Sequence, residues 1–204
     1  MRTSILRGAA TRSTALMSAA VLSTTLLLTT LLLTACGGGS PEAAPVPDDW
    51  QTFTAGRVVV KAPPTWRKLD APSAGDGTTT TTFGLPDDGS MVRPGVSVTS
   101  VPHPDRDAAD EASALVTREK ATNGAKDVTT TEVERAGATS AVEVTFWQEL
   151  RSAEGPVEVA HHWLVADLDD GSQVLVGALG ARADFEELPL DEAIAAVDLR
   201  GGDS

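Results

Sequence analysis

Hydrophobic positions follow two different patterns along this chain. One is a continuous run from about Ala15 to Leu33, built mainly of Leu, Ala, Val and Thr without a charged residue. The other begins near residue 50, where short β-branched runs are separated by turn residues, a pattern typical of strands. It predicts eight strands, at Trp50–Thr54, Arg57–Ala62, Thr78–Leu85, Gly95–Val101, Val128–Arg135, Ser140–Leu150, Val157–Leu168 and Gln173–Ala181.

Two segments have helical periodicity instead. In the first, Asp107–Thr122, Asp107 is the predicted N-cap, and the apolar stripe comprises Ala108, Ala112, Leu115, Val116 and Ala121. The second covers about Leu190 to Val197 and follows Pro189. The predicted order is therefore strands interrupted once in mid-chain by a helix and closed by another.

Asp-Gly turns join the last strands into hairpins, which imply antiparallel pairing. Asp169-Asp170-Gly171-Ser172 lies between two apolar strands, and Asp87–Ser90 and Ala136-Gly137 have similar compositions. If Leu150 pairs with Val157, three further pairs lie on one face: Phe146 with His161, Val144 with Trp163, and Val142 with Val165.

Apolar residues also occur on the second face of this hairpin, so both faces need cover. The second face carries Glu143, Thr145, Trp147 and Glu149 beside Glu158, Ala160, His162 and Leu164. Continuing through the next turn adds Leu175 and Leu179 to the second face and Val176 and Ala178 to the first. The predicted fold class is α+β, an antiparallel β-sheet with helices packed on its faces.

The apolar run near the N-terminus has the order of a targeting signal. Arg2, Arg7 and Arg12 precede it, and Leu33-Thr34-Ala35-Cys36 ends it. An uncleaved transmembrane helix and an ordinary secretory signal are the alternatives, since about 17–25 apolar residues can span a bilayer. The small residues before Cys36 and the glycines after it favour a lipoprotein signal.

This stretch resembles the lipobox of bacterial lipoproteins. The resemblance implies that the Cys36 sulfur receives a diacylglycerol, that fatty acyl chains such as palmitate anchor the protein, and that residues 1–35 are removed. We therefore expect a location on the extracytoplasmic face of the cell membrane. Residues 36–49, rich in Gly and Pro, are predicted to be a disordered linker, and residues 50–204 a single α+β domain.

Charge and cysteine content limit the partners of the mature chain. Removing residues 1–35 takes away three of the 16 basic residues and none of the 29 acidic ones, which leaves a net charge of −16. Nucleic acid is therefore not expected as a partner, because like charges repel. Cys36 is the single cysteine, so no disulfide is available to stabilise the domain.

A family resemblance adds to this interpretation. Trp50-Gln51-Thr52-Phe53, the strand Val58–Lys61 and the following Ala62-Pro63-Pro64-Thr65-Trp66 combine with the mid-chain helix, the long hairpins and the terminal helix. Over residues 50 to 200 this order resembles the actinobacterial LpqN/LpqT lipoproteins, whose domain is PsbP-like. The resemblance implies an α/β/α sandwich and a non-enzymatic envelope lipoprotein that binds proteins or cell-wall glycolipids. The chain departs from the family in having no tyrosine and few aromatic residues.

Candidate metal sites have simpler structural explanations. His161 and His162 are neighbours on a strand and so point to opposite faces, and His103 lies between two prolines. Asp167–Gly171 resembles the start of a calcium loop but lacks its ligand spacing, and a hairpin turn explains it. We therefore expect no metal site and no cofactor.

No catalytic residues are predicted. The chain has no Gly-x-Ser-x-Gly elbow, and its one cysteine is expected to be acylated. The carboxylates Glu149 and Glu158 pair across a hairpin, as acidic residues often do by chance in so acidic a chain. An esterase-like envelope hydrolase with a triad built from distant residues stays the alternative.

Trp147 and His162, on the second face, are the predicted ligand- or partner-binding residues. Trp147 is flanked by polar residues of the same phase, so it is either covered by a helix or exposed as an interface anchor. We expect a monomeric, lipid-anchored binding or accessory protein of the cell envelope, whose protein or glycolipid partner is unknown. A structural component of an envelope assembly is a third alternative.

Overall fold

The structure, a computed structural model, describes residues 46–69, 77–86, 91–153, 155–188 and 190–201. The described residues belong to one compact unit. The predicted signal, Cys36 and the predicted turn Asp87–Ser90 lie outside them, and so does the side chain of Glu186. Within the described ranges, no helix is long and apolar enough to cross a bilayer.

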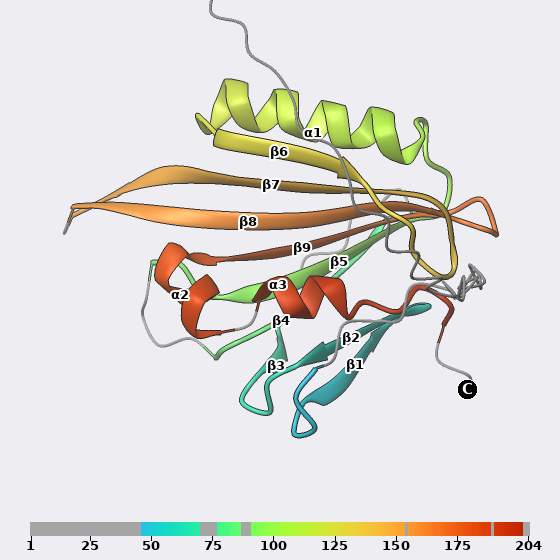
Figure 1. Cartoon of the computed structure of the whole chain (residues 1–204), viewed down its shortest axis with the longest axis horizontal. Helices are drawn as coiled ribbons and strands as arrows, with labels where there is room; N and C mark the ends of the chain where they lie inside the picture. The colour runs from blue at the N-terminus through green and yellow to red at the C-terminus, as the bar shows by residue number, and fades with distance from the viewer. Residues whose placement is uncertain (1–45, 70–76, 87–90, 154, 189, 202–204) are drawn as a thin grey trace, which may run out of the picture. The chain divides into compact units, whose positions relative to one another are not determined.

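Nine strands and three helices make up the described fold (Figure 1). All eight predicted strands and both predicted helices are present, with ends shifted by at most three residues. A three-residue strand and a six-residue helix were not predicted. The elements are β1 (Gln51–Ala55), β2 (Val58–Ala62), β3 (Arg67–Leu69), β4 (Thr79–Gly84), β5 (Gly95–Val101), α1 (Ala108–Thr122), β6 (Lys126–Glu132), β7 (Ala138–Ser152), β8 (Gly155–Leu168), β9 (Gln173–Ala181), α2 (Arg182–Glu187) and α3 (Leu190–Ala195).

Seven of the strands form one antiparallel sheet in the order β3-β4-β5-β9-β8-β7-β6, and β1 and β2 form a separate hairpin. The predicted register of the long β7–β8 hairpin is confirmed, with Leu150 opposite Val157 and Val144 opposite Trp163. The antiparallel α+β class is therefore what the structure shows.

The predicted register of the next hairpin is wrong by one residue. Leu164 pairs with Val176, and Val165 pairs with Leu175, so Leu175 and Leu179 lie on the first face. The cause is the turn, in which Gly171 has φ +80° and three residues separate Leu168 from Ser172. A three-residue turn with glycine in the left-handed region shifts the register by one residue relative to a two-residue turn, and that shift exchanges the faces.

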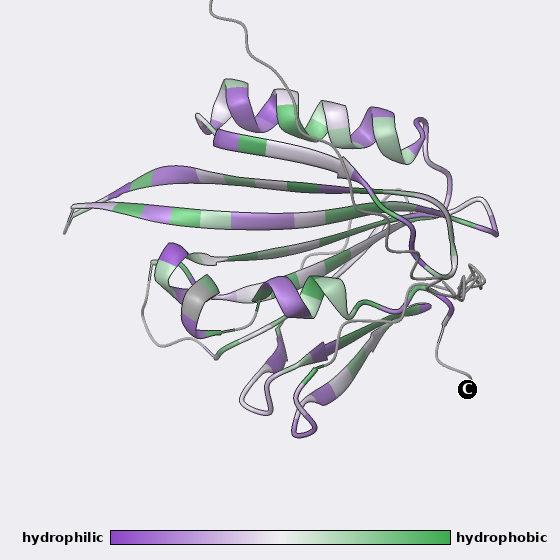
Figure 2. Ribbon diagram, in the orientation of Figure 1, coloured by the Kyte–Doolittle hydropathy of each residue, from purple (hydrophilic) through white to green (hydrophobic). Residues whose placement is uncertain are grey.

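The first face packs against α1. Asp107 caps this helix as predicted, its side chain accepting a hydrogen bond from the Asp110 amide. Figure 2 shows green and purple segments alternating along α1, as expected of an amphipathic helix. The buried cluster on this face contains Ala108, Ala112, Val142, Val144, Phe146 and Val165.

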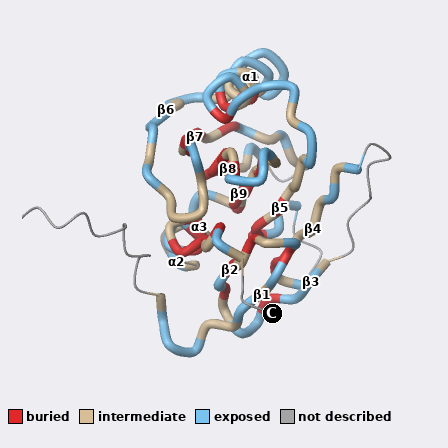
Figure 3. The backbone as a smooth tube through the Cα atoms, turned by 90° about the vertical axis from the view of Figure 1, so that its right-hand side faces the viewer, coloured by how far each residue is buried: buried red, intermediate tan, exposed pale blue. Residues whose placement is uncertain are grey.

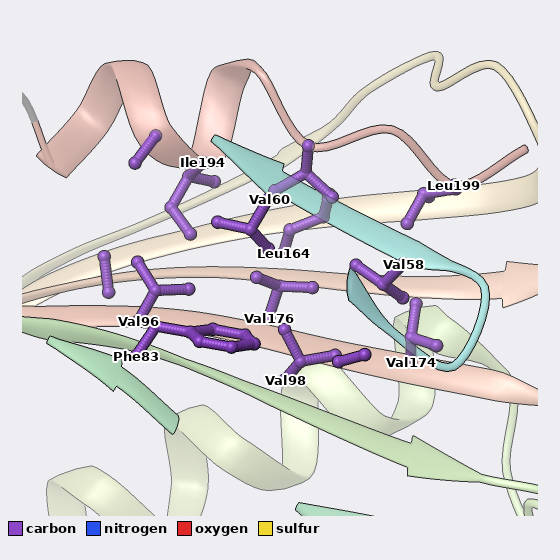
Figure 4. Close-up of a cluster of buried hydrophobic side chains, with 14 of the residues drawn as sticks. Val58, Val60, Phe83, Val96, Val98, Leu164, Val174, Val176, Ile194 and Leu199 are labelled. Atoms are coloured by element: carbon purple, nitrogen blue, oxygen red, sulfur yellow. The ribbon is translucent and has the colours of Figure 1, made fainter. Parts of the chain in front are cut away.

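The second face carries the larger core. Figure 3 shows buried backbone along the central strands and exposed backbone on the outer side of α1. Side chains from β2, β4, β5, β8, β9 and α3 converge there (Figure 4), among them Val60, Phe83, Val98, Leu164, Val176 and Ile194. Helices thus lie on both faces, and the β1–β2 hairpin shares the second face with α2 and α3.

Candidate functional site

Trp147 and His162 project from neighbouring strands onto the second face of the sheet. Trp147, on β7, lies opposite Ala160, and His162, on β8, lies opposite Thr145. The structure therefore brings the two predicted binding residues to the same region of the sheet. Their environments differ, since Trp147 is half-buried and His162 is 8% exposed.

A β-bulge fixes the orientation of Trp147. The pairing of β6 with β7 shifts between Lys126 and Thr129, and Asp127 within the shift has φ +50°. This left-handed conformation is uncommon outside glycine, although Asp tolerates it better than most residues. It allows the Asp127 side chain to accept a hydrogen bond from the indole, with 2.7 Å between Trp147 Nε1 and Asp127 Oδ2.

Two cations lie close to the Trp147 ring. Lys126 Nζ is 4.5 Å from the ring centroid and Arg182 Cζ is 5.7 Å from it. Both distances are within the range of cation–π attraction. Arg182, in the first turn of α2, also forms an ion pair with Glu158 at 3.2 Å. The indole is therefore a platform that already attracts positive charge.

A hollow of about 390 Å³ lies beside this indole. We call it the Trp147 hollow. Its lining combines aromatic residues with charged residues from three separate elements. The lining residues are Asp127, Thr145, Phe146, Trp147, Ala160, His161, Arg182, Phe185 and Asp191.

His162 lies behind the hollow in a network of charged groups. Its Nδ1 is 2.7 Å from Asp191 Oδ1, and its Nε2 is 3.5 Å from Glu143 Oε2. Burial alone would lower the pKa of His162, but its hydrogen bond to Asp191 and its ion pair with Glu143 outweigh burial and raise the pKa to about 9. His162 is therefore positively charged at neutral pH.

The same network fastens α3 to the sheet. Arg135 donates to Glu143 and to the carbonyl oxygen of Ala195 at 3.0 Å, at the C-terminal end of α3. His162 and Arg135 together lower the pKa of Glu143, with His162 contributing most. Because Asp191 both lines the hollow and bonds His162, His162 positions a hollow-lining carboxylate without lining the hollow itself.

His161 lies on the opposite face of the sheet. Its ring stacks on Phe146, with centroids 4.5 Å apart and planes inclined by 14°. Burial lowers the pKa of His161 to about 4, despite the nearby carboxylate of Glu119. The side chains of His161 and His162 therefore point to opposite faces of the sheet, as predicted. Among the described residues, no group of three or more His, Cys, Asp or Glu side chains could hold a metal ion.

His103 lines a second hollow of about 480 Å³ between β5 and the start of α1. The loop at this place is held by Gln173, whose Nε2 donates to the carbonyl of Arg106 at 3.0 Å and to Asp167 at 2.8 Å. Asp167 also accepts a hydrogen bond from the Ala108 amide. This polar network attaches the first turn of α1 to the sheet.

The predicted calcium-like segment is a hairpin turn. The Asp170 side chain accepts hydrogen bonds from the amide and the hydroxyl of Ser172. Arg57, in the β1–β2 turn, forms ion pairs with Asp169 and Asp170 at 2.8 Å each. The acidic residues thus stabilise a turn and tie it to a distant hairpin.

Sequence reasoning missed four residues around Trp147. Lys126 and Asp127 precede the predicted start of their strand, and the bulge that directs them has no sequence signal. Arg182 and Phe185 belong to α2, which was not predicted because it follows β9 without an intervening loop.

No family model matches this chain. No curated protein matches it either. Among solved structures, LpqN of Mycobacterium tuberculosis, described as involved in cell envelope biogenesis, is 14% identical, with a TM-score of 0.46 over 73% of this chain and 89% of LpqN.

Two further solved structures are similar. A Pseudomonas aeruginosa protein of unknown function is 13% identical, with a TM-score of 0.43 over 68% of this chain and 87% of its own. A Bacteroides thetaiotaomicron protein is also 13% identical, with a TM-score of 0.43 over 76% of this chain and 50% of its own. Because all three TM-scores lie below 0.5, these similarities do not assign the chain to a family.

Proposed function

We propose that this chain is a lipid-anchored, non-catalytic binding protein of the bacterial cell envelope, and that it holds its partner in the Trp147 hollow. The lipobox-like stretch ending at Cys36 supports the anchor. The hollow supports binding, since concave sites with aromatic walls and a few fixed polar groups are typical of ligand sites. We also propose that the fold is the α/β/α sandwich of PsbP-like domains, which the helices on both faces support.

The observation that carries this proposal is the orientation of Trp147. A half-exposed indole usually needs no functional explanation. Here, however, a bulge and a left-handed Asp127 hold it at the wall of a hollow. Bulges occur often beside functional sites, where they redirect a side chain. An oriented aromatic ring loses little conformational freedom when a partner binds.

A non-catalytic role agrees with the geometry of the histidines. His162 directs both ring nitrogens at carboxylates, so neither is directed at a hydroxyl nucleophile. Its positive charge at neutral pH also makes it unsuitable as a general base. His161 stacks on Phe146 on the other face, away from Asp191 and Glu143. The hydrolase alternative would need a different site.

Photo-crosslinking in the native envelope tests the proposal. A photoreactive phenylalanine analogue would replace Phe185, which lines the hollow, in the full chain. The control position is Thr79 on β4, which β5, β9 and β8 separate from β7 in the sheet order. We expect an adduct from position 185 that disappears with Trp147→Ala, and none from position 79. No adduct from position 185, or equal adducts from both, would overturn the proposal.

A further inference from the structure

The charged residues of the Trp147 hollow restrict the class of ligand that it can bind. This inference rests on the proposed function. Of its charged lining residues, Asp127 and Asp191 are acidic and Arg182 is basic. Arg182 is already paired with Glu158, and Asp191 is already paired with the charged His162. Among the described residues, Asp127 is therefore the charged lining residue without an ion pair. The helices α2 and α3, which supply Arg182, Phe185 and Asp191 to the lining, also carry the acidic residues Asp184, Glu187 and Glu192, and the whole chain has a net charge of −13. A positively charged ligand is therefore the best electrostatic match for the hollow.

The indole already has a positively charged group against it. Lys126 lies over the ring at 4.5 Å and has no ion pair with any other residue in the described ranges. Its side chain is exposed, so this contact is weak and easily exchanged. A second Lys or Arg could therefore replace it while also meeting the carboxylate of Asp127, which has no ion pair in the described ranges.

The size of the hollow argues for a side chain over a lipid. Its volume of about 390 Å³ is near the lower end of the range for ligand sites, about 300–1,000 Å³. Phe185 and Ala160 supply apolar surface for the methylene stem of a long basic side chain. Trp147 and the Asp127 carboxylate line the hollow and can meet its charged head.

We propose that the Trp147 hollow binds a Lys or Arg side chain from an extended basic segment of a protein partner, and that this side chain takes the place of Lys126 over the indole. Asp127 has two tasks in this arrangement. It orients the indole through the Nε1 hydrogen bond, and it contributes negative charge to the hollow.

Titration of the full chain with blocked peptides tests this inference. The probe is the acetylated and amidated pentapeptide Gly-Lys-Gly-Lys-Gly, and the matched control replaces both lysines with glutamates. The readout is the NMR signal of the Trp147 Nε1–H group, identified by its loss in Trp147→Phe. We expect the lysine peptide to move this signal saturably and the glutamate peptide to leave it in place.

Matched variants separate site binding from general attraction to an acidic protein. Asp127→Asn keeps an acceptor for the indole and should weaken binding at least threefold, whereas Asp105→Asn, which removes the same charge before α1, should change it less than twofold. Lys126→Ala should strengthen binding at least threefold because it removes the competing cation. Lys120→Ala, on the exposed side of α1, should change binding less than twofold.

Equal effects of Lys126→Ala and Lys120→Ala, or of Asp127→Asn and Asp105→Asn, would overturn the inference. A shift of the Trp147 signal by the glutamate peptide would do the same. If the crosslink at position 185 forms in the envelope but the lysine peptide fails to bind, the basic-segment inference fails alone. Absence of the crosslink rejects the proposed function itself.

Discussion

His161 and His162 are adjacent on β8, yet their rings lie on opposite faces of the sheet and their pKa values move in opposite directions. The His161 ring stacks on Phe146, and burial lowers its pKa to about 4. The His162 ring forms a hydrogen bond with Asp191 and an ion pair with Glu143, and its pKa rises to about 9. Because successive side chains of a strand point to opposite faces, β8 carries one histidine that is neutral and one that is charged at neutral pH.

Acid should destabilise the domain through His161. In the unfolded chain its pKa is about 6.5, so the unfolded state binds a proton more readily. The stability due to neutral His161 is complete above about pH 6.5 and is lost as the pH falls towards 4. We expect wild type to lose about 3 kcal/mol over this window relative to His161→Phe, which keeps a stacking ring but cannot titrate.

Urea unfolding at a series of pH values between 4 and 7 measures this difference. His103→Gln, at an exposed position, is the control and should follow wild type. Parallel stability curves for wild type and His161→Phe would show that His161 does not titrate as described.

Alkali should destabilise the domain through His162, because its folded pKa lies above the unfolded value of about 6.5. The stability due to charged His162 is complete below about pH 6.5 and is lost as the pH rises through 9. His162→Gln should therefore be less stable than wild type by up to about 3 kcal/mol near pH 6, with the difference shrinking towards pH 9.5. Thermal melts at pH 6, 8 and 9.5 check this, and a difference that grows with pH would contradict it.

Two glutamates on the same face of β7 should respond differently to charge reversal. Glu143 is half-buried between the cationic side chains of Arg135 and His162. Glu143→Lys would gather three positive charges there and should cost about 3–5 kcal/mol, as breaking buried ion pairs does. Glu149→Lys, at an exposed position, should change stability by less than about 0.5 kcal/mol. Equal denaturation midpoints for the two variants would show that the network does not stabilise α3.

The anchor is tested at its single thiol. Cys36→Ala should abolish acylation and leave the longer precursor, because the chain has no other cysteine to take the lipid. Intact-mass measurement of wild type and variant from membranes decides this. An unmodified Cys36, or a mature N-terminus elsewhere, would reject the lipoprotein interpretation.

Elements with strong local signals could be predicted from the sequence. β-branched runs identified eight strands, and Asp107 identified the start of α1 because its side chain forms a local cap. The β8–β9 turn shows the limit. Its Asp-Gly composition indicated a hairpin, but a two-residue and a three-residue turn share that composition. Whether the number of turn residues is even or odd decides on which face of the sheet Leu175 lies.

The candidate site was predictable only in part. Trp147 stood out because polar residues flank it in the same phase. Asp127 and Lys126 contact it because of a β-bulge. The bulge depends on the pairing of two strands, so the sequence of either strand alone does not indicate it. The ion pairs of Glu143 with Arg135 and His162 could not be predicted, because they depend on how β7 pairs with β8 and on where the turn before β7 places Arg135.

The position of β5 beside β9 sets an order for the folding of this chain. Strands β6 to β9 are consecutive hairpins and can form from local contacts, as can β3 to β5. The two groups join where β5 pairs with β9, from Gly95 opposite Leu179 to Val101 opposite Gln173, and α1 and three strands lie between β5 and β9 in the sequence. Closing so long a loop is entropically costly and slows folding. A chain emerging from the ribosome therefore stays without its completed sheet until β9 has been made, which would suit the export to the cell envelope that we propose.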